Sequence, residues 1–448
     1  MVARRWSRTR AAGAAAAVVL STLGAAACSP DTNWVESSDS AAWPGMGGNA
    51  RNSSYADRPA ASTLVAAWTR PTGGPNYAPA SITNRGYVAL TAKTPDGCST
   101  FYLELTVGRK IYCRRDADGT EMQTPLVDQF DYTYVGIPGL VTSPDQANQM
   151  RWRRPVAGDP LWLKFAGPGR LLVITHIGQV LVLDAHSGNP TGPSYGLVPN
   201  LTVADPSDGI ADCPTAGPGC PVAAPPAVDD GAQRAYVVVK PPGAAHGNLV
   251  AFGYGVVNGF NTIQPLWQRT DMTDDPWGSP VLSADGKTLY VNGRDDKLIA
   301  VDAQTGRTKW TYDTGYSTKL APSVAPDGTI VLAAGADSRA PLTALRDEGT
   351  SARVLFTRKD VMEVSVPAQV RGGLGYTVVR AWGGGKTQLI EFDTSTGGTR
   401  RSFDLPPDVT STSGVSIGPG GEVVTIADDG VVYAFTSGRK TGDSERSD

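Results

Sequence analysis

The sequence lacks three features that would place it in large classes of proteins. Its 40 Lys and Arg residues are interspersed with 43 Asp and Glu residues, so that the formal net charge is -3 and no basic stripe forms. A surface without such a stripe has little attraction for nucleic acid. No stretch shows a convincing apolar helix period, and after residue 23 no segment is apolar enough to cross a membrane. We therefore expect an all-β chain that does not bind nucleic acid.

Residue types that catalytic and metal sites need are also scarce. The three histidines, His176, His186 and His246, share no spacing, no two cysteines are adjacent, and no Cys-x-x-Cys-His motif occurs. The run 116–119 resembles part of a calcium loop but lacks the Glu that would end it, and the Asp pairs of the chain lie in turn sequences. We expect no catalytic residue and no metal site.

The N-terminus has the form of an export signal. Four arginines within residues 4–10 precede an apolar run over residues 11–23, and three alanines lead to Cys28. This pattern predicts a lipoprotein signal peptide over residues 1–28, with Cys28 lipidated and the protein held on the outer face of the cell membrane. The alternative is an ordinary cleaved signal that leaves Cys28 free. Residues 29–60 are predicted to be a tether and lead-in segment, and residues 437–448 a disordered tail.

Four further cysteines, Cys98, Cys113, Cys213 and Cys220, form an even set in an exported chain. An oxidising compartment favours two disulfides. Three pairings are possible, and we favour the two local ones. Cys213 and Cys220 lie in a proline-rich stretch near residues 191–227, which we interpret as an insertion that either binds a partner or has no function of its own.

One sequence unit recurs along the chain. Its clearest copy, residues 279–310, contains four short strands separated by tight turns, with Asp285-Gly286 and Thr305-Gly306 at turns that need positive φ. Similar units follow at intervals of about 45 residues, within the range of a propeller blade. An outer strand near Trp68 has no unit of its own, and the last unit, which ends at Phe435, lacks an outer strand. Pairing the two predicts eight four-stranded antiparallel blades over residues 61–436, closed by an N-terminal strand.

The run from Leu298 to Gly306, followed by Trp310, resembles the repeat of the pyrroloquinoline-quinone-type (PQQ-like) propellers, and Trp43-Pro44 and Arg51-Asn52 resemble the N-terminal lead-in of that family. The resemblance implies that the repeat tryptophan of each blade packs against the neighbouring blade. The family includes quinone-dependent dehydrogenases, which hold the quinone and a metal ion in the central funnel, and the lipoprotein propeller of the outer-membrane barrel assembly machine. The dehydrogenases typically carry a vicinal Cys-Cys pair under the quinone, which is missing here.

A second group of aromatic residues lies outside the repeat position, in loops that we expect to open on one face beside charged side chains. Exposed aromatics with charged neighbours are typical of protein-binding hot spots. The predicted binding residues are Trp162, Lys164, Trp277, Asp274, Asp275, Arg294, Asp295 and Trp382.

These observations favour a non-catalytic, monomeric scaffold that binds an envelope protein partner and carries no cofactor. Two alternatives stay open: a quinone-dependent dehydrogenase with PQQ and calcium, and a protein that binds a cell-wall glycan or a small ligand in the central funnel.

Overall fold

The computed structural model describes residues 35–95, 97–116, 123–203, 205, 220–258, 260–272, 275–335 and 338–437. The predicted signal peptide with Cys28, the cysteine Cys213, the residue Asp274 and the predicted tail after residue 437 lie outside the described residues. The chain divides into two compact units, Met1–Val35 and Glu36–Asp448, and the second unit carries all the described strands. No helix in the described ranges is both long and apolar enough to cross a membrane.

The described strands form groups of four antiparallel neighbours, which we number as blades 1 to 8. Blades 1 to 4 contain β3 (Ser81–Ile82), β4 (Tyr87–Thr91), β5 (Thr100–Glu104) and β6 (Lys110–Arg114); β7 (Leu126–Val127), β8 (Thr133–Ile137), β9 (Leu140–Pro144) and β10 (Met150–Pro155); β11 (Trp162–Phe165), β12 (Arg170–Ile174), β13 (Gln179–Asp184) and β14 (Tyr195–Gly196); and β15 (Ala227–Asp229), β16 (Arg234–Val239), β17 (Asn248–Val257) and β18 (Phe260–Arg269).

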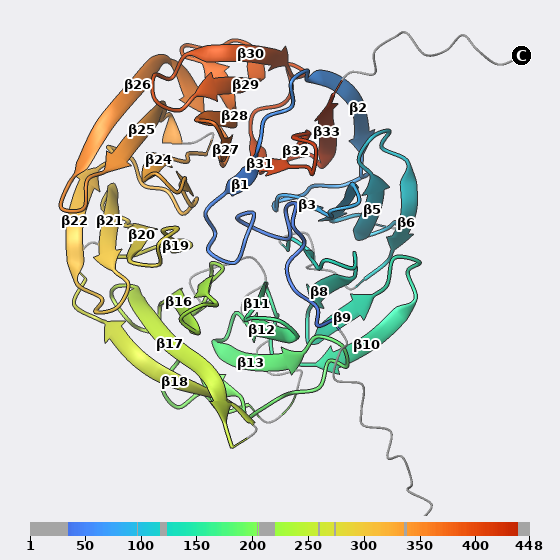
Figure 1. Ribbon diagram of the computed structural model, residues 1–448, viewed down its shortest axis with the longest axis vertical. Coiled ribbons are helices and arrows are strands. Elements are labelled where there is room, and N and C mark those ends of the chain that lie inside the picture. The colour runs from blue at the N-terminus through green and yellow to red at the C-terminus, as the bar shows by residue number, and fades with distance from the viewer. Residues whose placement is uncertain are drawn as a thin grey trace, which may run out of the picture. The chain divides into compact units, whose positions relative to one another are not determined.

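Blades 5 to 8 contain β19 (Val281–Leu282), β20 (Thr288–Asn292), β21 (Lys297–Asp302) and β22 (Thr308–Asp313); β23 (Ser323–Val324), β24 (Thr329–Val331), β25 (Pro341–Asp347) and β26 (Ala352–Glu363); β27 (Ala368–Arg371), β28 (Leu374–Ala381), β29 (Thr387–Asp393) and β30 (Thr399–Asp404); and β31 (Thr412–Ile417), β32 (Val423–Ala427), β33 (Val431–Thr436) and β2 (Val65–Pro71). Blades 6 and 7 belong to one larger sheet because the end of β26 also pairs with β28. The blades follow one another around a ring, as Figure 1 shows.

The ring is closed by the strand that the sequence predicts. β2 pairs antiparallel with β33, with Trp68 opposite Ala434 and Ala66 opposite Phe435. Figure 1 shows the blue β2 beside the red β33 at this seam. An N-terminal strand therefore supplies the outermost position of the last blade, and the edge of β33 is covered.

Contacts between blades use the repeat tryptophans, as the resemblance implies. The indole N–H of Trp68 in blade 8 donates to the carbonyl of Leu105 in blade 1 at 2.7 Å. Trp152 donates to Ala185 at 3.1 Å, and Trp267 donates to Ala303 at 3.2 Å. In each case the partner belongs to the next blade of the ring. The same indole hydrogen bond thus recurs between neighbouring blades around the propeller, and the packing of the indole side chains fixes the spacing of the blades.

The lead-in segment, which we define as residues 36–54, starts beside blades 2 and 3. The amide of Gly169 donates to the carbonyl of Ser37 at 2.7 Å, and the amide of Gln129 donates to the carbonyl of Ser38 at 3.0 Å. Farther along, Trp43 and Ile82 exchange two main-chain hydrogen bonds, at 3.0 and 2.8 Å. The segment therefore passes from blades 2 and 3 to the first strand of blade 1.

The second half of the lead-in segment runs along the inner strands of four successive blades. Four of its carbonyl groups accept main-chain hydrogen bonds there: Ala50 from Val228 (2.8 Å), Arg51 from Leu282 (3.0 Å), Ser53 from Val324 (2.8 Å) and Ser54 from Gln369 (2.8 Å). β1 (Tyr55–Pro59) then pairs in parallel with β27. The blue chain accordingly lies in the centre of the ring in Figure 1.

Strand direction gives the ring two distinct faces. We call the side with the turns between first and second strands, such as residues 83–86, 128–132 and 166–169, the base face. We call the opposite side the mouth face, because it carries the connections into each first strand, such as residues 72–80, and the turns between second and third strands. The contacts of Ser37 and Ser38 are made with base-face turns.

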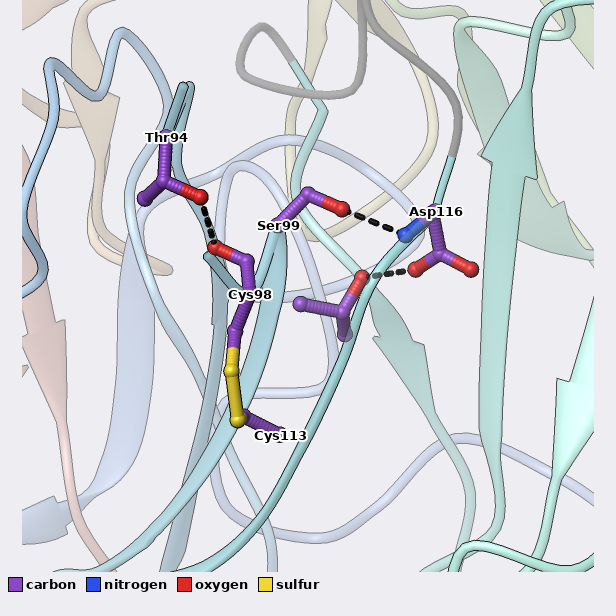
Figure 2. The surroundings of a disulfide bond; sticks show 6 residues. Thr94, Cys98, Ser99, Cys113 and Asp116 are labelled. Atoms are coloured by element: carbon purple, nitrogen blue, oxygen red, sulfur yellow. Dashed lines mark hydrogen bonds between the residues drawn. A yellow bond between two sulfur atoms is a disulfide. The ribbon is translucent and has the colours of Figure 1, made fainter. Parts of the chain in front are cut away.

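One of the two local disulfides predicted from the sequence is present between Cys98 and Cys113 in blade 1. Cys98 precedes β5 and Cys113 lies on β6, so the bond links two paired strands. Around it, the Thr94 hydroxyl donates to the carbonyl of Cys98 at 2.6 Å and the Asp116 amide donates to the Ser99 hydroxyl at 2.6 Å (Figure 2). Cys220 is also disulfide-bonded, and its partner lies outside the described residues.

Candidate functional site at the mouth of the central funnel

A cavity of about 360 Å³ opens at the mouth face, on the axis of the ring. Its walls come from residues that enter the first strands of several blades, including Tyr77, Trp162 and Lys319. Its inner end is closed by Trp43, Met46 and other residues of the lead-in segment. The N-terminal segment therefore fills the channel on the base side and leaves a blind cavity on the mouth side. This volume falls within the range of small-molecule and peptide side-chain sites.

Three buried polar atoms in residues that line this cavity have no hydrogen-bond partner: Nε1 of Trp43, Oδ1 of Asn52 and Nε1 of Trp162. Two are donors and one is an acceptor. The amide nitrogen of Asn52 is fully used, because it donates to the carbonyls of Pro226 and Pro280 at 2.9 and 3.0 Å. Leaving a buried polar atom unpaired costs about 1–3 kcal/mol. Each of these three atoms is itself buried, so a ligand in the cavity would reach them only after lining side chains move.

A second cavity of about 260 Å³ adjoins the first and shares Ala223, Ala224 and Lys319 with it. Three cationic side chains line it, Lys240, Arg294 and Lys319, and its described lining contains no carboxylate. Trp277 also lines it, and the guanidinium of Arg294 lies 4.2 Å from the centre of the Trp277 ring. Three cationic side chains therefore line the mouth of the funnel beside blades 4 to 6, and one of them, Arg294, is paired with Asp275.

Asp275 fixes the position of Arg294 in this second cavity. Its carboxylate lies 3.3 Å from Nε of Arg294 and accepts a hydrogen bond from the Gly247 amide at 2.6 Å. The amide of Arg294 in turn donates to the carbonyl of Asp275 at 3.0 Å. Three of the residues predicted from the sequence, Trp277, Asp275 and Arg294, thus form one cluster. Asp295 lies in the adjacent turn and pairs with Lys297 at 2.6 Å.

Trp162 and Lys164 differ from the expectation that they lie in an exposed loop. Both belong to β11, and only 7% of Trp162 and 2% of Lys164 are exposed. The sequence around them has short apolar runs with prolines on both sides, which does not distinguish an inner strand from a loop. Trp162 still lines the first cavity, whereas Lys164 faces the lead-in segment.

Lys164 holds the lead-in segment in the channel. Its ammonium group donates to the carbonyls of Met46 and Asn49 at 2.6 and 2.9 Å. Burial lowers the pKa of Lys164, and the nearby charge of Asp39 opposes this shift. Burial likewise raises the pKa of Asp39, which the charge of Lys164 opposes. Lys164 therefore has a structural role: it binds the lead-in segment, whose Met46 lines the first cavity.

Trp382 is 51% exposed and lies on the mouth face, in the turn between β28 and β29. It lines neither of the two cavities. The sequence correctly placed it in a loop beside strand ends, but the structure does not bring it to the Trp277 cluster.

A hydrolase-type nucleophile motif occurs in the chain but has a structural role. Residues Gly414 to Gly418 have the Gly-x-Ser-x-Gly spacing of a nucleophile elbow, which requires an exposed Ser at a strand-to-helix turn. Ser416 instead lies inside β31, is fully buried, and donates to the carbonyl of Ala80 at 2.7 Å. The hydroxyl links blade 8 to blade 1.

The donor set of the funnel does not fit a quinone cofactor with calcium. Calcium takes six to eight oxygen ligands, mostly from carboxylates and carbonyls. The described residues that line the first cavity include no Asp or Glu and one charged side chain, Lys319. No group of three or more potential metal ligands occurs among the described residues.

Sequence reasoning missed the part that the lead-in segment plays in the site. Trp43, Met46 and Asn52 form the inner end of the cavity, yet they lie in a Gly- and Asn-rich stretch that was expected to be a tether. Two signals were available: Trp43 and Met46 are bulky apolar residues, which are unusual in a solvated linker, and Trp43-Pro44 and Arg51-Asn52 resemble the N-terminal lead-in of the family.

Comparisons with known proteins agree with the fold. The family model described as outer membrane protein assembly factor BamB matches residues 255–360. BamB from Moraxella catarrhalis superposes with a TM-score of 0.55 at 16% identity, covering 83% of this chain and 99% of that one. Quinohemoprotein alcohol dehydrogenase from Comamonas testosteroni superposes with a TM-score of 0.61 at 13% identity, covering 91% of this chain and 82% of that one.

A sequence relative extends the comparison over nearly the whole chain. Protein Rv3035 from Mycobacterium tuberculosis is 38% identical over 412 residues, which are 91% of this chain and 99% of that protein. Identity at this level over this length is far above that of the structural neighbours. The chain therefore belongs to the same family as Protein Rv3035, and it is a PQQ-like β-propeller.

Proposed function

We propose that this protein is a non-catalytic, extracytoplasmic lipoprotein that binds an acidic segment of an envelope protein at the mouth of its funnel. The observation that carries the proposal is the second cavity, whose lining combines Lys240, Lys319 and the stacked pair of Arg294 and Trp277. An aromatic ring and cations around a concave surface are the composition of a protein-binding hot spot. A segment with carboxylates and apolar side chains is complementary to both adjoining cavities.

The comparisons support a role in protein interaction without specifying the partner. The matching family model carries the description of an outer membrane protein assembly factor. The predicted signal peptide and lipidation of Cys28 complete the proposal of an envelope location. The scarcity of carboxylates in the funnel makes the quinone-dependent alternative less well supported than the scaffold.

Capture of partners from solubilised membranes, with the full-length lipoprotein as bait, tests the proposal. A Trp277→Ala variant and a Lys240→Ala/Lys319→Ala variant should each lose a protein that the wild type retains. Lys287→Ala is the matched control, because Lys287 is an exposed cation in the same blade but in a base-face turn. Retention of that protein should also weaken as the salt concentration rises.

Equal retention by the wild type, both mouth variants and Lys287→Ala would contradict binding at the mouth. Oxidation of alcohols or sugars by the purified protein with added quinone and calcium, in the absence of any retained partner, would establish the dehydrogenase alternative instead.

A second candidate function is the binding of a small ligand in the first cavity. The volume of about 360 Å³ and a described lining with one charged side chain, Lys319, favour it, because such a cavity suits a small neutral ligand. Native mass spectrometry of the protein purified from its own membranes would detect such a ligand. A protein that carries no added mass and whose tryptophan fluorescence is unchanged by cell-wall glycan fragments and polar metabolites would count against this candidate.

A further inference from the structure

The lead-in segment connects the predicted lipid anchor to one face of the ring, and this connection determines which face can approach the membrane. Two of its first residues contact base-face turns: Ser37 accepts from Gly169, and the side chain of Gln129 donates to the carbonyl of Glu36 at 3.0 Å. Gln129 and Gly169 lie in turns that follow the innermost strands of blades 2 and 3. Glu36, where the lead-in segment begins, therefore lies at the base face near the axis of the ring, on the side opposite the cavities.

The tether between the anchor and this point is short. From Cys28 to Glu36 the chain advances eight residues. Fully extended residues span at most about 3.5 Å each, so the tether reaches no more than about 28 Å. A lipid on Cys28 keeps the base-face exit within that distance of the bilayer surface.

The size of the ring decides between the two orientations. A domain of this length has a radius of gyration of about 22 Å, which corresponds to an outer radius of about 28 Å. If the mouth face lay against the membrane, the tether would first have to run from the axis of the ring to its outer edge, a distance equal to that radius. It would then have to pass along the edge of a blade, about 17 Å for a strand of five residues. The required path of about 45 Å exceeds the reach of the tether by more than half.

We propose that the anchored propeller turns its base face to the membrane and presents the mouth of its funnel away from it. This inference rests on the lipid anchor at Cys28 that forms part of the proposed function. In this orientation the base-face turns face the membrane surface. The partner of the Trp277 cluster then approaches from the side of the cell wall or the surrounding soluble space, and not from within the bilayer.

Energy transfer from the protein to a lipid-headgroup dye measures this orientation. The full-length lipoprotein is reconstituted into phospholipid vesicles with a fluorophore on a single added cysteine. Asn84→Cys places it in the exposed base-face turn between β3 and β4, and Trp382→Cys places it in an exposed mouth-face turn. Both sites lie away from the cavities. We expect transfer to be about threefold or more stronger from position 84, given a ring of this thickness.

A lengthened tether tests the cause of the orientation. Inserting about 20 Gly and Ser residues after residue 30 brings the extended reach to roughly 100 Å and should largely remove the difference between the two positions. Equal transfer from both positions with the native tether, or stronger transfer from position 382, would overturn the proposed orientation.

The anchor is tested separately from the orientation. A Cys28→Ser variant should no longer float with the vesicles. Flotation of Cys28→Ser as complete as that of the wild type would refute the lipid anchor, and with it the inference. Anchored protein without a difference between positions 84 and 382 would refute the orientation and leave the anchor standing. Partner capture at the mouth is independent of both results.

Discussion

The indole ring of Trp68 covers the α-carbon of Gly108, and a methyl group on that carbon would lie 2.6 Å from the ring. Trp68 belongs to blade 8 and Gly108 to the turn between β5 and β6 of blade 1, so this contact lies at the seam where the ring closes. The same relationship recurs between Trp152 and Gly188. Gly108 has a φ of +65°, which glycine adopts without strain. The absence of a side chain also lets the indole of Trp68 approach the backbone closely.

Replacing Gly108 by Ala should destabilise the protein more than the turn conformation alone explains. Gly349→Ala is the matched control, because Gly349 also has positive φ, +87°, but its α-carbon faces open space. The control should lose about 1 kcal/mol of unfolding free energy, and Gly108→Ala about 1–3 kcal/mol more from overpacking. Urea denaturation of both variants measures the difference. Losses of equal size would show that the Trp68 ring adjusts at no cost.

Replacing Lys164 by Met should release the lead-in segment. The change removes the hydrogen bonds to the carbonyls of Met46 and Asn49 and leaves the Asp39 carboxylate without its opposing charge. Loss of one member of a buried pair costs about 3–5 kcal/mol. Faster proteolysis within residues 36–54 and a lower urea midpoint are the expected results.

The double variant Asp39→Asn/Lys164→Met provides the control for this charge effect. It removes both charges and should recover part of the loss. A double variant less stable than Lys164→Met would show that the charge pair does not contribute to holding the segment.

Glu363 should make the stability of the protein depend on pH. Burial raises the pKa of this carboxyl well above its ordinary value of 4.5, and one oxygen accepts a hydrogen bond from Thr377 at 2.7 Å. The folded protein therefore keeps a proton that the unfolded chain loses above about pH 4.5. The contribution of Glu363 to the unfolding free energy should fall by about 1.4 kcal/mol per pH unit above that point, until the pKa of the folded state is reached.

Glu363→Gln removes this titration and keeps the acceptor for Thr377. The melting temperatures of the variant and the wild type should be similar at pH 4 and diverge as the pH rises, with the variant more stable. A constant difference between the two proteins from pH 4 to pH 8 would exclude the titration of Glu363 as the cause.

Loss of the Cys98–Cys113 disulfide should lower stability through the unfolded state. The bond closes a loop of 15 residues, for which chain entropy predicts a contribution of about 3 kcal/mol. Cys98→Ser/Cys113→Ser should therefore have a lower urea midpoint than the wild type under oxidising conditions. An unchanged midpoint would mean that the paired strands β5 and β6 already hold this part of blade 1.

The sequence predicted the ring because its signals are local and repeated. Turn residues such as Asp285-Gly286 and the tryptophans at equivalent positions recur with the blade, and the missing outer strand of the last unit required the strand of Trp68. Cys98 and Cys113 are close in sequence, and their pairing was predicted for that reason.

The site was less predictable because it is built from non-local contacts. Trp277, Asp275 and Arg294 cluster across one connection and one turn of blade 5, which sequence proximity could suggest. Trp43 is held by backbone hydrogen bonds to Ile82 and Asn52 by side-chain hydrogen bonds to Pro226 and Pro280, and no local pattern encodes such contacts. Lys164 appears exposed by residue type alone, since lysine is rarely buried.

The closure of the ring by β2 also sets the order in which the chain can become stable during its synthesis. β1 and β2 are synthesised early, whereas their partners β27 and β33 are synthesised late. Contacts between such distant parts of a chain form slowly, and the intervening strands have open edges until they do. A chain that stops before β33 therefore leaves β2 without its partner strand, and the ring stays open at the seam between blades 8 and 1.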